Sequence, residues 1–166
     1  MATVIYYSSS TGNTEKSAGR IRKNLSKDIK LVNISNDGFE NIEQYDKIIL
    51  GSSTWGDGEL QDDWDEKWKE FCKIDFSGKT VALFGLGDQD SYADTFLDAM
   101  GLIYEELINK GVNIIGHTLT EGYDFDSSKA VVDDEFVGLA LDEDNQSDLS
   151  KGRIAQWCES IKAQIL

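Results

Sequence analysis

Hydrophobic positions along this chain alternate between two spacings. Short β-branched and aromatic runs, typical of buried strands, occur at 2–7, 29–34, 46–53, 80–84 and 112–116. Between these runs, apolar residues recur every three or four positions, which predicts helices with one buried face. The predicted buried helix positions are Ala18, Ile21 and Leu25; Trp64, Trp68, Phe71 and Cys72 on one helix; Phe96, Met100, Ile103, Leu107 and Ile108 on the next; and Ile154, Cys158, Ile161 and Ile165 on the last.

This alternation of strands and helices predicts an α/β fold. Five strands separated by helical segments favour parallel pairing with crossover helices on both faces. We therefore predict a doubly wound, five-stranded parallel sheet in the order 2-1-3-4-5, within a single domain spanning 1–166. The stretch 118–147 is acidic and rich in turn residues, with an apolar patch at 136–141, and we interpret it as an insertion in the last strand.

Charge narrows the partners that we expect. The chain has 31 Asp and Glu against 16 Lys and Arg, a net charge of −15, which repels nucleic acid and anionic membranes and favours basic protein surfaces. No apolar run reaches the ~18 residues of a membrane span, and no signal-peptide pattern precedes the first strand. We expect a cytoplasmic monomer with no membrane insertion. Cys72 and Cys158 are interpreted as buried thiols, and the single His117 as a strand-end residue.

A run of small donor residues follows the first strand. Ser8 to Thr14 leads directly into a helix and offers hydroxyl groups, a glycine and unpaired backbone N–H groups. The start of a helix carries partial positive charge, so a phosphate can be held there without a Lys or Arg. An ordinary helix cap is the alternative interpretation.

Two other phosphate-binding motifs fail on their spacing. Gly78-Lys79-Thr80 would end a Walker A loop only if position 73 were glycine, and it is Lys73. Gly85 and Gly87 begin a dinucleotide fingerprint, but position 90 is an aspartate and the run follows the fourth strand. The loop after the first strand is therefore the candidate anion site.

Two aromatic residues are predicted at the same edge of the sheet. Trp55 lies among glycines and acids after the third strand, and Tyr92 lies in a similar loop after the fourth. Because parallel strands end at one edge, both rings should lie near the candidate anion site. A flat aromatic ligand between the rings would cover their apolar surface, although the rings could instead cover the edge of the core.

These motifs together resemble the flavodoxin family. The resemblance is carried by Ser-x-Thr-Gly-Asn-Thr at 9–14, Thr54-Trp55, Gly58-Glu59-Leu60-Gln61, Phe84 to Gln89 and the following Tyr92. The segment 136–146 is similar to the long-chain branch of that family. Gly56-Asp57 after the tryptophan is more like short-chain members, and Ser53 stands where a proline is common.

The resemblance implies noncovalent binding of FMN. Ser9, Ser10, Thr11, Gly12, Asn13 and Thr14 would hold its phosphate, Trp55 would cover one face of the ring, and Tyr92 would cover the other. Backbone groups of Gly56, Gly87 and Asp88 would meet the polar edge, and Asp144 would lie near the ribityl chain. The other residues expected at the site are Ser53, Thr54, Asp57, Gly58 and Leu86.

The implied function is a low-potential one-electron carrier that is not an enzyme. It would move FMN between quinone, semiquinone and hydroquinone states and dock basic redox proteins such as a ferredoxin/flavodoxin-NADP reductase. We further expect the Gly56-Asp57 peptide to turn over during reduction, because glycine tolerates positive φ.

Two alternatives stay open: an FMN enzyme that uses NAD(P)H, and an interaction module that has lost its cofactor. A receiver-type signalling domain is rejected. It would need acidic residues at the ends of the first and third strands, and those positions hold Ser8-Ser9 and Ser53-Thr54.

Overall fold

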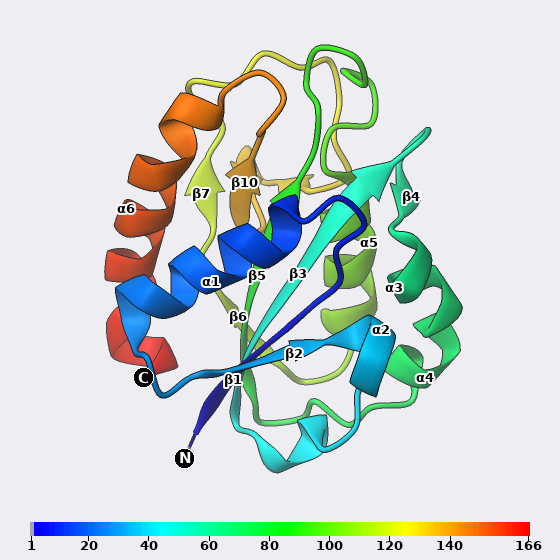
Figure 1. Cartoon of the computed structure of the whole chain (residues 1–166). Helices are drawn as coiled ribbons and strands as arrows, with labels where there is room; N and C mark the ends of the chain where they lie inside the picture. Colours follow the sequence, from blue (N-terminus) through cyan, green and yellow to red (C-terminus); the bar gives the residue numbers. More distant parts are fainter. Residues whose placement is uncertain (1) are drawn as a thin grey trace.

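The computed structural model describes residues 2–166, which form a central parallel sheet between two layers of helices (Figure 1). The main strands are β1 (Thr3–Tyr7), β2 (Lys30–Asn33), β3 (Lys47–Trp55), β5 (Thr80–Leu86), β6 (Asn113–Ile115) and β10 (Leu139–Leu141). The helices are α1 (Asn13–Leu25), α2 (Ile34–Asp37), α3 (Asp62–Glu66), α4 (Trp68–Cys72), α5 (Asp98–Leu107) and α6 (Ser147–Ile165), with a 3₁₀ turn η1 (Ile42–Gln44). A short β4 (Glu59–Leu60) pairs antiparallel with the end of β3.

The strand order confirms the predicted sheet. It runs β2, β1, β3, β5, and both β6 and β10 then pair parallel with β5. β6 lies beside Thr80–Ala82 and β10 beside Phe84–Leu86, so the fifth position of the sheet is filled by two short strands. The chain between them forms a small antiparallel sheet of β7 (Thr118–Leu119), β8 (Val131–Val132) and β9 (Glu135–Phe136). The insertion therefore interrupts the last strand, as predicted. Its predicted bounds of 118–147 were too wide, because Leu139–Leu141 form β10 and belong to the main sheet.

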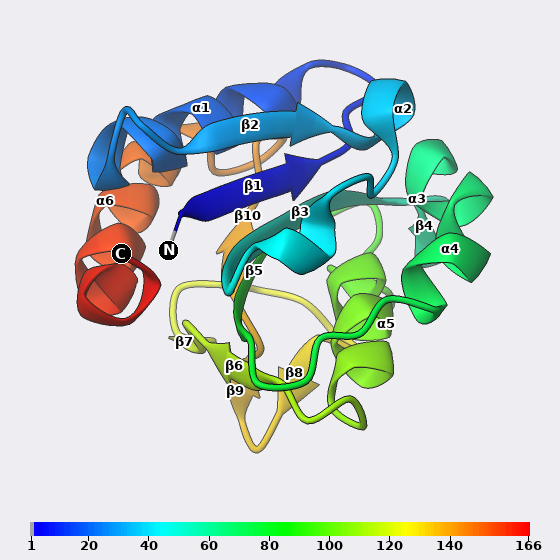
Figure 2. The same ribbon diagram turned by 90° about the horizontal axis from the view of Figure 1, so that it is seen from below.

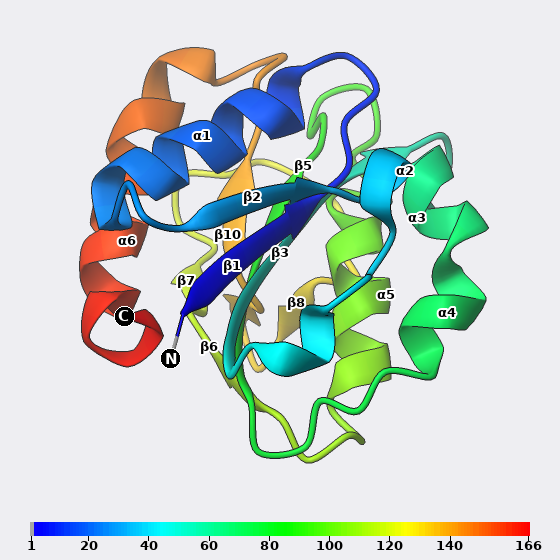
Figure 3. The ribbon, with the colours of Figure 1, turned by 60° about the horizontal axis from the view of Figure 1, so that its bottom comes forward.

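Two hydrophobic cores lie on opposite faces of the sheet, because successive strand residues point to opposite sides. Ile5 and Ile49 face α1 and α6, while Val4 and Ile48 face α3, α4 and α5. Figures 2 and 3 show these two helix layers on either side of the strands. All four of these strand residues are completely buried, so helices cover both faces of the sheet. A ligand can therefore reach the sheet only at its edges.

Some helix boundaries differ from the predicted ones. The expected helix from Trp64 to Cys72 is two helices, α3 and α4, that meet at Lys67 (φ −96°, ψ 6°), outside the helical region. Cys72 is only half-buried, so its prediction as a buried thiol was wrong, whereas Cys158 is buried and both thiols are free. Phe96 precedes α5, since Leu97 takes a left-handed conformation at φ 60°, and Ile108 follows α5 and is 48% exposed.

The carboxyl ends of β1, β3, β5 and β10 meet at one edge of the sheet, at the top of Figure 1. The four loops that leave them carry the residues singled out in the sequence. Among residues 2–166, no helix has the length and hydrophobicity of a membrane span.

Candidate functional site

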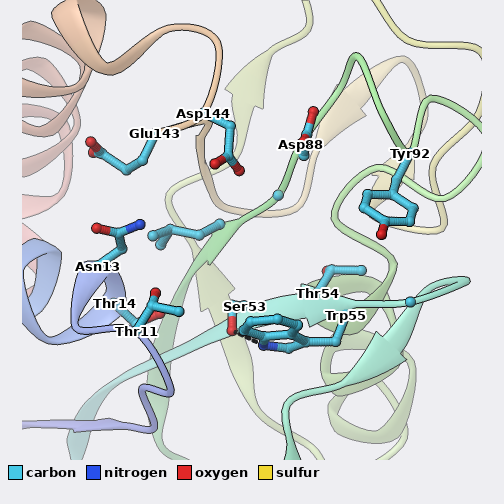
Figure 4. A pocket seen from close by; sticks show the side chains of 13 residues that line it. Thr11, Asn13, Thr14, Ser53, Thr54, Trp55, Asp88, Tyr92, Glu143 and Asp144 are labelled. Atoms are coloured by element: carbon cyan, nitrogen blue, oxygen red, sulfur yellow. Dashed lines mark hydrogen bonds between the residues drawn. The ribbon is translucent and has the colours of Figure 1, made fainter.

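A pocket opens where these four loops meet (Figure 4), with a cavity volume of about 280 Å³. This volume is near the lower end of small-molecule pockets, ~300–1,000 Å³, so a larger ligand would extend into solvent. The residues that line the pocket are Thr11, Asn13, Thr14, Ser53, Thr54, Trp55, Gly56, Leu86, Gly87, Asp88, Tyr92, Glu143 and Asp144.

Most of the sequence-predicted site residues line this one cavity. The exceptions are Ser9, Ser10, Gly12, Asp57 and Gly58, which lie in the same loops without forming its wall. The sequence did not single out Glu143, which lines the pocket beside Asp144. A carboxylate next to a predicted site residue was the signal that could have found it.

The end of the pocket predicted to bind an anion is the start of α1. Gly12 precedes the helix in a left-handed conformation (φ 93°), and no side chain caps the helix. The first helical bond runs from Lys16 N to Gly12 O at 3.0 Å, which leaves the earlier N–H groups of α1 without a helical partner. The ordinary-cap interpretation is therefore wrong for this loop. Ser9 Oγ instead accepts a hydrogen bond from Gly12 N at 3.0 Å.

Hydroxyl groups surround this helix start. Thr11 and Thr14 line the cavity, and Ser10 Oγ accepts a hydrogen bond from Gln61 Nε2 at 2.8 Å. Ser8 is completely buried, and its hydroxyl finds no hydrogen-bond partner among residues 2–166. Lysine and arginine are absent from the cavity lining of the described chain. An anion here would be held by dipoles, not by an ion pair.

Two aromatic rings border the other end of the pocket, as Figure 4 shows. Trp55 ends β3 and is 42% exposed, and Tyr92 follows β5 and is 46% exposed. Trp55 Nε1 donates a hydrogen bond to Ser53 Oγ at 2.8 Å, which orients the indole ring. The two exposed rings therefore offer apolar surface on which a flat group could stack.

The turn after Trp55 lies against the buried side chain of Asp98. Gly56 and Gly58 both take positive φ, at 51° and 90°. A Cβ on Gly58 would come within 2.6 Å of Asp98 Oδ2. Asp98 is 4% exposed and accepts a hydrogen bond from Lys129 N at 2.7 Å; burial raises the pKa of its carboxyl group. Glycine is therefore required at position 58 by both space and conformation.

Acids line the wall opposite the aromatic rings. Burial raises the pKa of Asp144, and the charges of Asp88, Asp142 and Glu143 raise it further. Burial also acts to raise the pKa of Asp88, but hydrogen bonds from Ser91 and Asn145 outweigh it and hold that pKa below its usual value. An added negative charge in this pocket would meet like charges on this side.

Comparisons of sequence and of structure both match this chain to flavodoxins. The family described as Flavodoxin matches residues 5–157. Flavodoxin 2 of Escherichia coli (strain K12) is 48% identical over 160 residues, which cover 95% of this chain and 92% of that protein. The flavodoxin of Synechocystis sp. is 46% identical over 160 residues, covering 95% of this chain and 94% of that protein.

Solved structures agree with the sequence comparison. The Fusobacterium nucleatum flavodoxin bound to flavin mononucleotide superposes with a TM-score of 0.94 at 34% identity, covering 100% of both chains. Oxidised Flavodoxin 2 from Bacillus cereus gives a TM-score of 0.74 at 26% identity over 99% of both chains. On its sheet order, its pocket and these matches, the chain belongs to the flavodoxin family.

Proposed function

We propose that this protein carries single electrons on an FMN bound noncovalently in the pocket described above. The observation that carries this proposal is the pairing of an uncapped helix start with two half-exposed aromatic rings in one cavity. The Fusobacterium nucleatum relative of matching fold binds flavin mononucleotide. When bound, FMN supplies the redox chemistry, and the protein binds, orients and shields it.

Residues 9–14 fit the phosphate of FMN. Three of them, Thr11, Asn13 and Thr14, line the cavity, and the first N–H groups of α1 have no helical partner. Gly12 leaves open space where a side chain would begin, so the backbone can approach an anion closely. We propose that Ser9, Ser10 and Gly12, which belong to the same loop, also take part in holding the phosphate.

Trp55 and Tyr92 fit the two faces of the flavin ring. Stacking on an aromatic ring contributes ~0.5–1.5 kcal/mol beyond the area that it buries. Both side chains would also exclude water from the ring, which strengthens every charge interaction within the pocket. Backbone groups of Gly56, Gly87 and Asp88 are available for the polar edge of the ring, and Asp144 for the ribityl chain.

The protein can favour one oxidation level through its own backbone and charges. The positive φ of Gly56 is accessible to glycine, so its peptide can turn and present a carbonyl acceptor toward the ring. Carboxylates on or near the loops, at Asp57, Glu59, Asp62, Asp63 and Asp88, would disfavour a second added electron. A destabilisation of ~1.4 kcal/mol lowers a one-electron potential by ~59 mV.

We propose that basic redox proteins dock beside the pocket. Seven acids lie between Asp57 and Glu70, against Lys67 and Lys69. Of these acids, Asp63 is half-buried and the others are exposed. Complementary charge raises the rate of encounter and is weakened by salt. We also propose that the protein works as a monomer in the cytoplasm, where its two free thiols would stay reduced.

Stepwise anaerobic reduction tests this function. The protein saturated with FMN is titrated with dithionite, and its visible spectrum is followed. We expect two separated one-electron steps, with no bleaching by NAD(P)H alone. A single two-electron step, or rapid bleaching by NAD(P)H, would contradict the carrier and favour an FMN enzyme.

A further inference from the structure

The most heavily hydrogen-bonded buried carboxylate near the pocket is that of Asp142, directly after β10. Its residue is 0% exposed. Its Oδ2 atom accepts hydrogen bonds from Gln89 N at 3.1 Å, Gln89 Nε2 at 2.7 Å and Asn145 Nδ2 at 2.9 Å. Its Oδ1 atom accepts from Asp144 N at 3.1 Å, Asn145 N at 3.0 Å and Asn145 Nδ2 at 3.2 Å.

These donors come from two loops that form separate parts of the pocket wall. Gln89 follows Gly87 and Asp88, and Asn145 follows Glu143 and Asp144. Asn145 Nδ2 also donates to Asp88 Oδ1 at 2.8 Å, so the two loops are joined a second time. Gln89 Oε1 in turn accepts from Asp124 N at 2.6 Å, which connects the insertion to the same group.

The Asp142 carboxyl group has no cationic partner among residues 2–166. Among residues 2–166, the only ion pair joins Lys110 and Glu106, so the Asp142 carboxylate is satisfied by N–H donors alone. A buried charge is costly unless its oxygens are hydrogen-bonded, so each loop must keep its donors in place. Any displacement of either loop would leave part of the carboxylate unsatisfied.

The sheet itself does not need this side chain. Backbone pairing already joins β5 to β10, and Gly87 N donates to Leu141 O at 3.0 Å at the end of the two strands. The side-chain bonds of Asp142 all go to loop residues beyond these strands. Its contacts therefore act on the pocket wall more than on the core.

We propose that Asp142 is a positioning residue of the pocket, which fixes the loop of Gly87 and Asp88 against the loop of Glu143 and Asp144. This inference rests on the proposed function, because its consequence is measured as flavin binding. The side-chain hydrogen bonds of Asp142 reach these two loops and not residues 9–14, so a change at Asp142 should affect FMN and riboflavin equally. A change in the phosphate loop would instead weaken FMN alone.

Three variants of the full chain test the proposal by fluorescence titration with FMN and with riboflavin. Asp142→Asn places a donor against donors, and we expect it to raise both dissociation constants about tenfold. Asn145→Ala removes the bridge between Asp142 and Asp88 from an exposed position, and we expect an increase of about threefold. Asp124→Asn is the control, since it removes an exposed charge but keeps the backbone bond to Gln89.

The outcomes separate the two proposals. If the unmodified protein fails to bind FMN, the proposed function fails, and the role of Asp142 fails with it. If the unmodified protein binds FMN and both Asp142→Asn and Asn145→Ala bind it equally well, only the role of Asp142 is overturned. A lower apoprotein Tm with unchanged dissociation constants would likewise show a purely structural role. Should Asp142→Asn fail to fold, the exposed Asn145→Ala variant decides.

Discussion

The indole N–H of Trp55 donates a hydrogen bond to the hydroxyl of Ser53, two residues earlier on β3, at 2.8 Å. This bond sets the plane of a ring that is otherwise 42% exposed. Ser53→Ala should free the ring to rotate and weaken FMN binding about two- to tenfold, the range of a single hydrogen bond. Fluorescence titration measures the change, and Ser160→Ala on α6 is the matched control. Equal affinities for both variants would contradict a role for this bond.

Loss of the rings themselves should have a larger effect. We expect Trp55→Leu and Tyr92→Leu each to weaken FMN binding about 5- to 100-fold, because each removes a stacking surface. Trp55→Phe keeps an aromatic face and should lose less than Trp55→Leu. Isothermal calorimetry measures all three variants, and equal losses for Phe and Leu would show that stacking contributes nothing.

Much of this site was predictable from sequence because parallel strands end at one edge. That rule predicts that Thr14, Trp55 and Tyr92 lie near one another, and all three line one pocket. The division of the last strand by an insertion was also predictable, from the acidic, turn-rich composition of 118–147.

Other features depend on contacts that no local pattern encodes. The apolar spacing from Trp64 to Phe71 continues across Lys67, so the break between α3 and α4 was hidden. The hydrogen bonds between Asp142 and Gln89 join residues 53 positions apart, and carboxylates are too frequent in this chain for one to stand out.

Two glycines of contrasting geometry give a stability test. A Cβ on Gly58 would lie 2.6 Å from Asp98 Oδ2 at a φ of 90°, so Gly58→Ala should destabilise the apoprotein by ~1–3 kcal/mol. Gly19 lies within α1 with nothing near its Cβ position, so Gly19→Ala should stabilise it by ~0.5–1 kcal/mol. Urea unfolding measures both free energies, and the same sign for the two variants would contradict the geometry.

Alkaline pH should destabilise the fold. Burial raises the pKa of Cys158 from 9.0 to about 12, and burial is also the main cause that raises the pKa of Tyr6 and Tyr123 from 10.0 to about 12. The protonated forms are favoured in the folded state, so their contribution is complete below pH 9 and is lost as the pH rises toward 12. Urea unfolding at pH 8 to 11 should show this fall. Cys158→Ala should fall less steeply, and an unchanged slope would rule out the thiol.

Charge reversal on the acidic segment tests the docking surface. Asp65 is exposed on α3, and Asp65→Lys should slow electron transfer to a basic haem protein at low ionic strength. The difference should shrink as salt is added, since exposed charges are screened over ~8 Å at physiological ionic strength. Glu159→Lys on α6 makes the same change in net charge and is the control. Equal slowing by both variants would assign the effect to net charge alone.

FMN binding in this pocket is tested most directly by an equilibrium titration of the apoprotein with FMN, followed by quenching of flavin fluorescence. We expect saturable binding of one FMN per chain, weakened when Trp55 is replaced by leucine. An apoprotein that leaves FMN fluorescence unchanged at every concentration would contradict FMN binding.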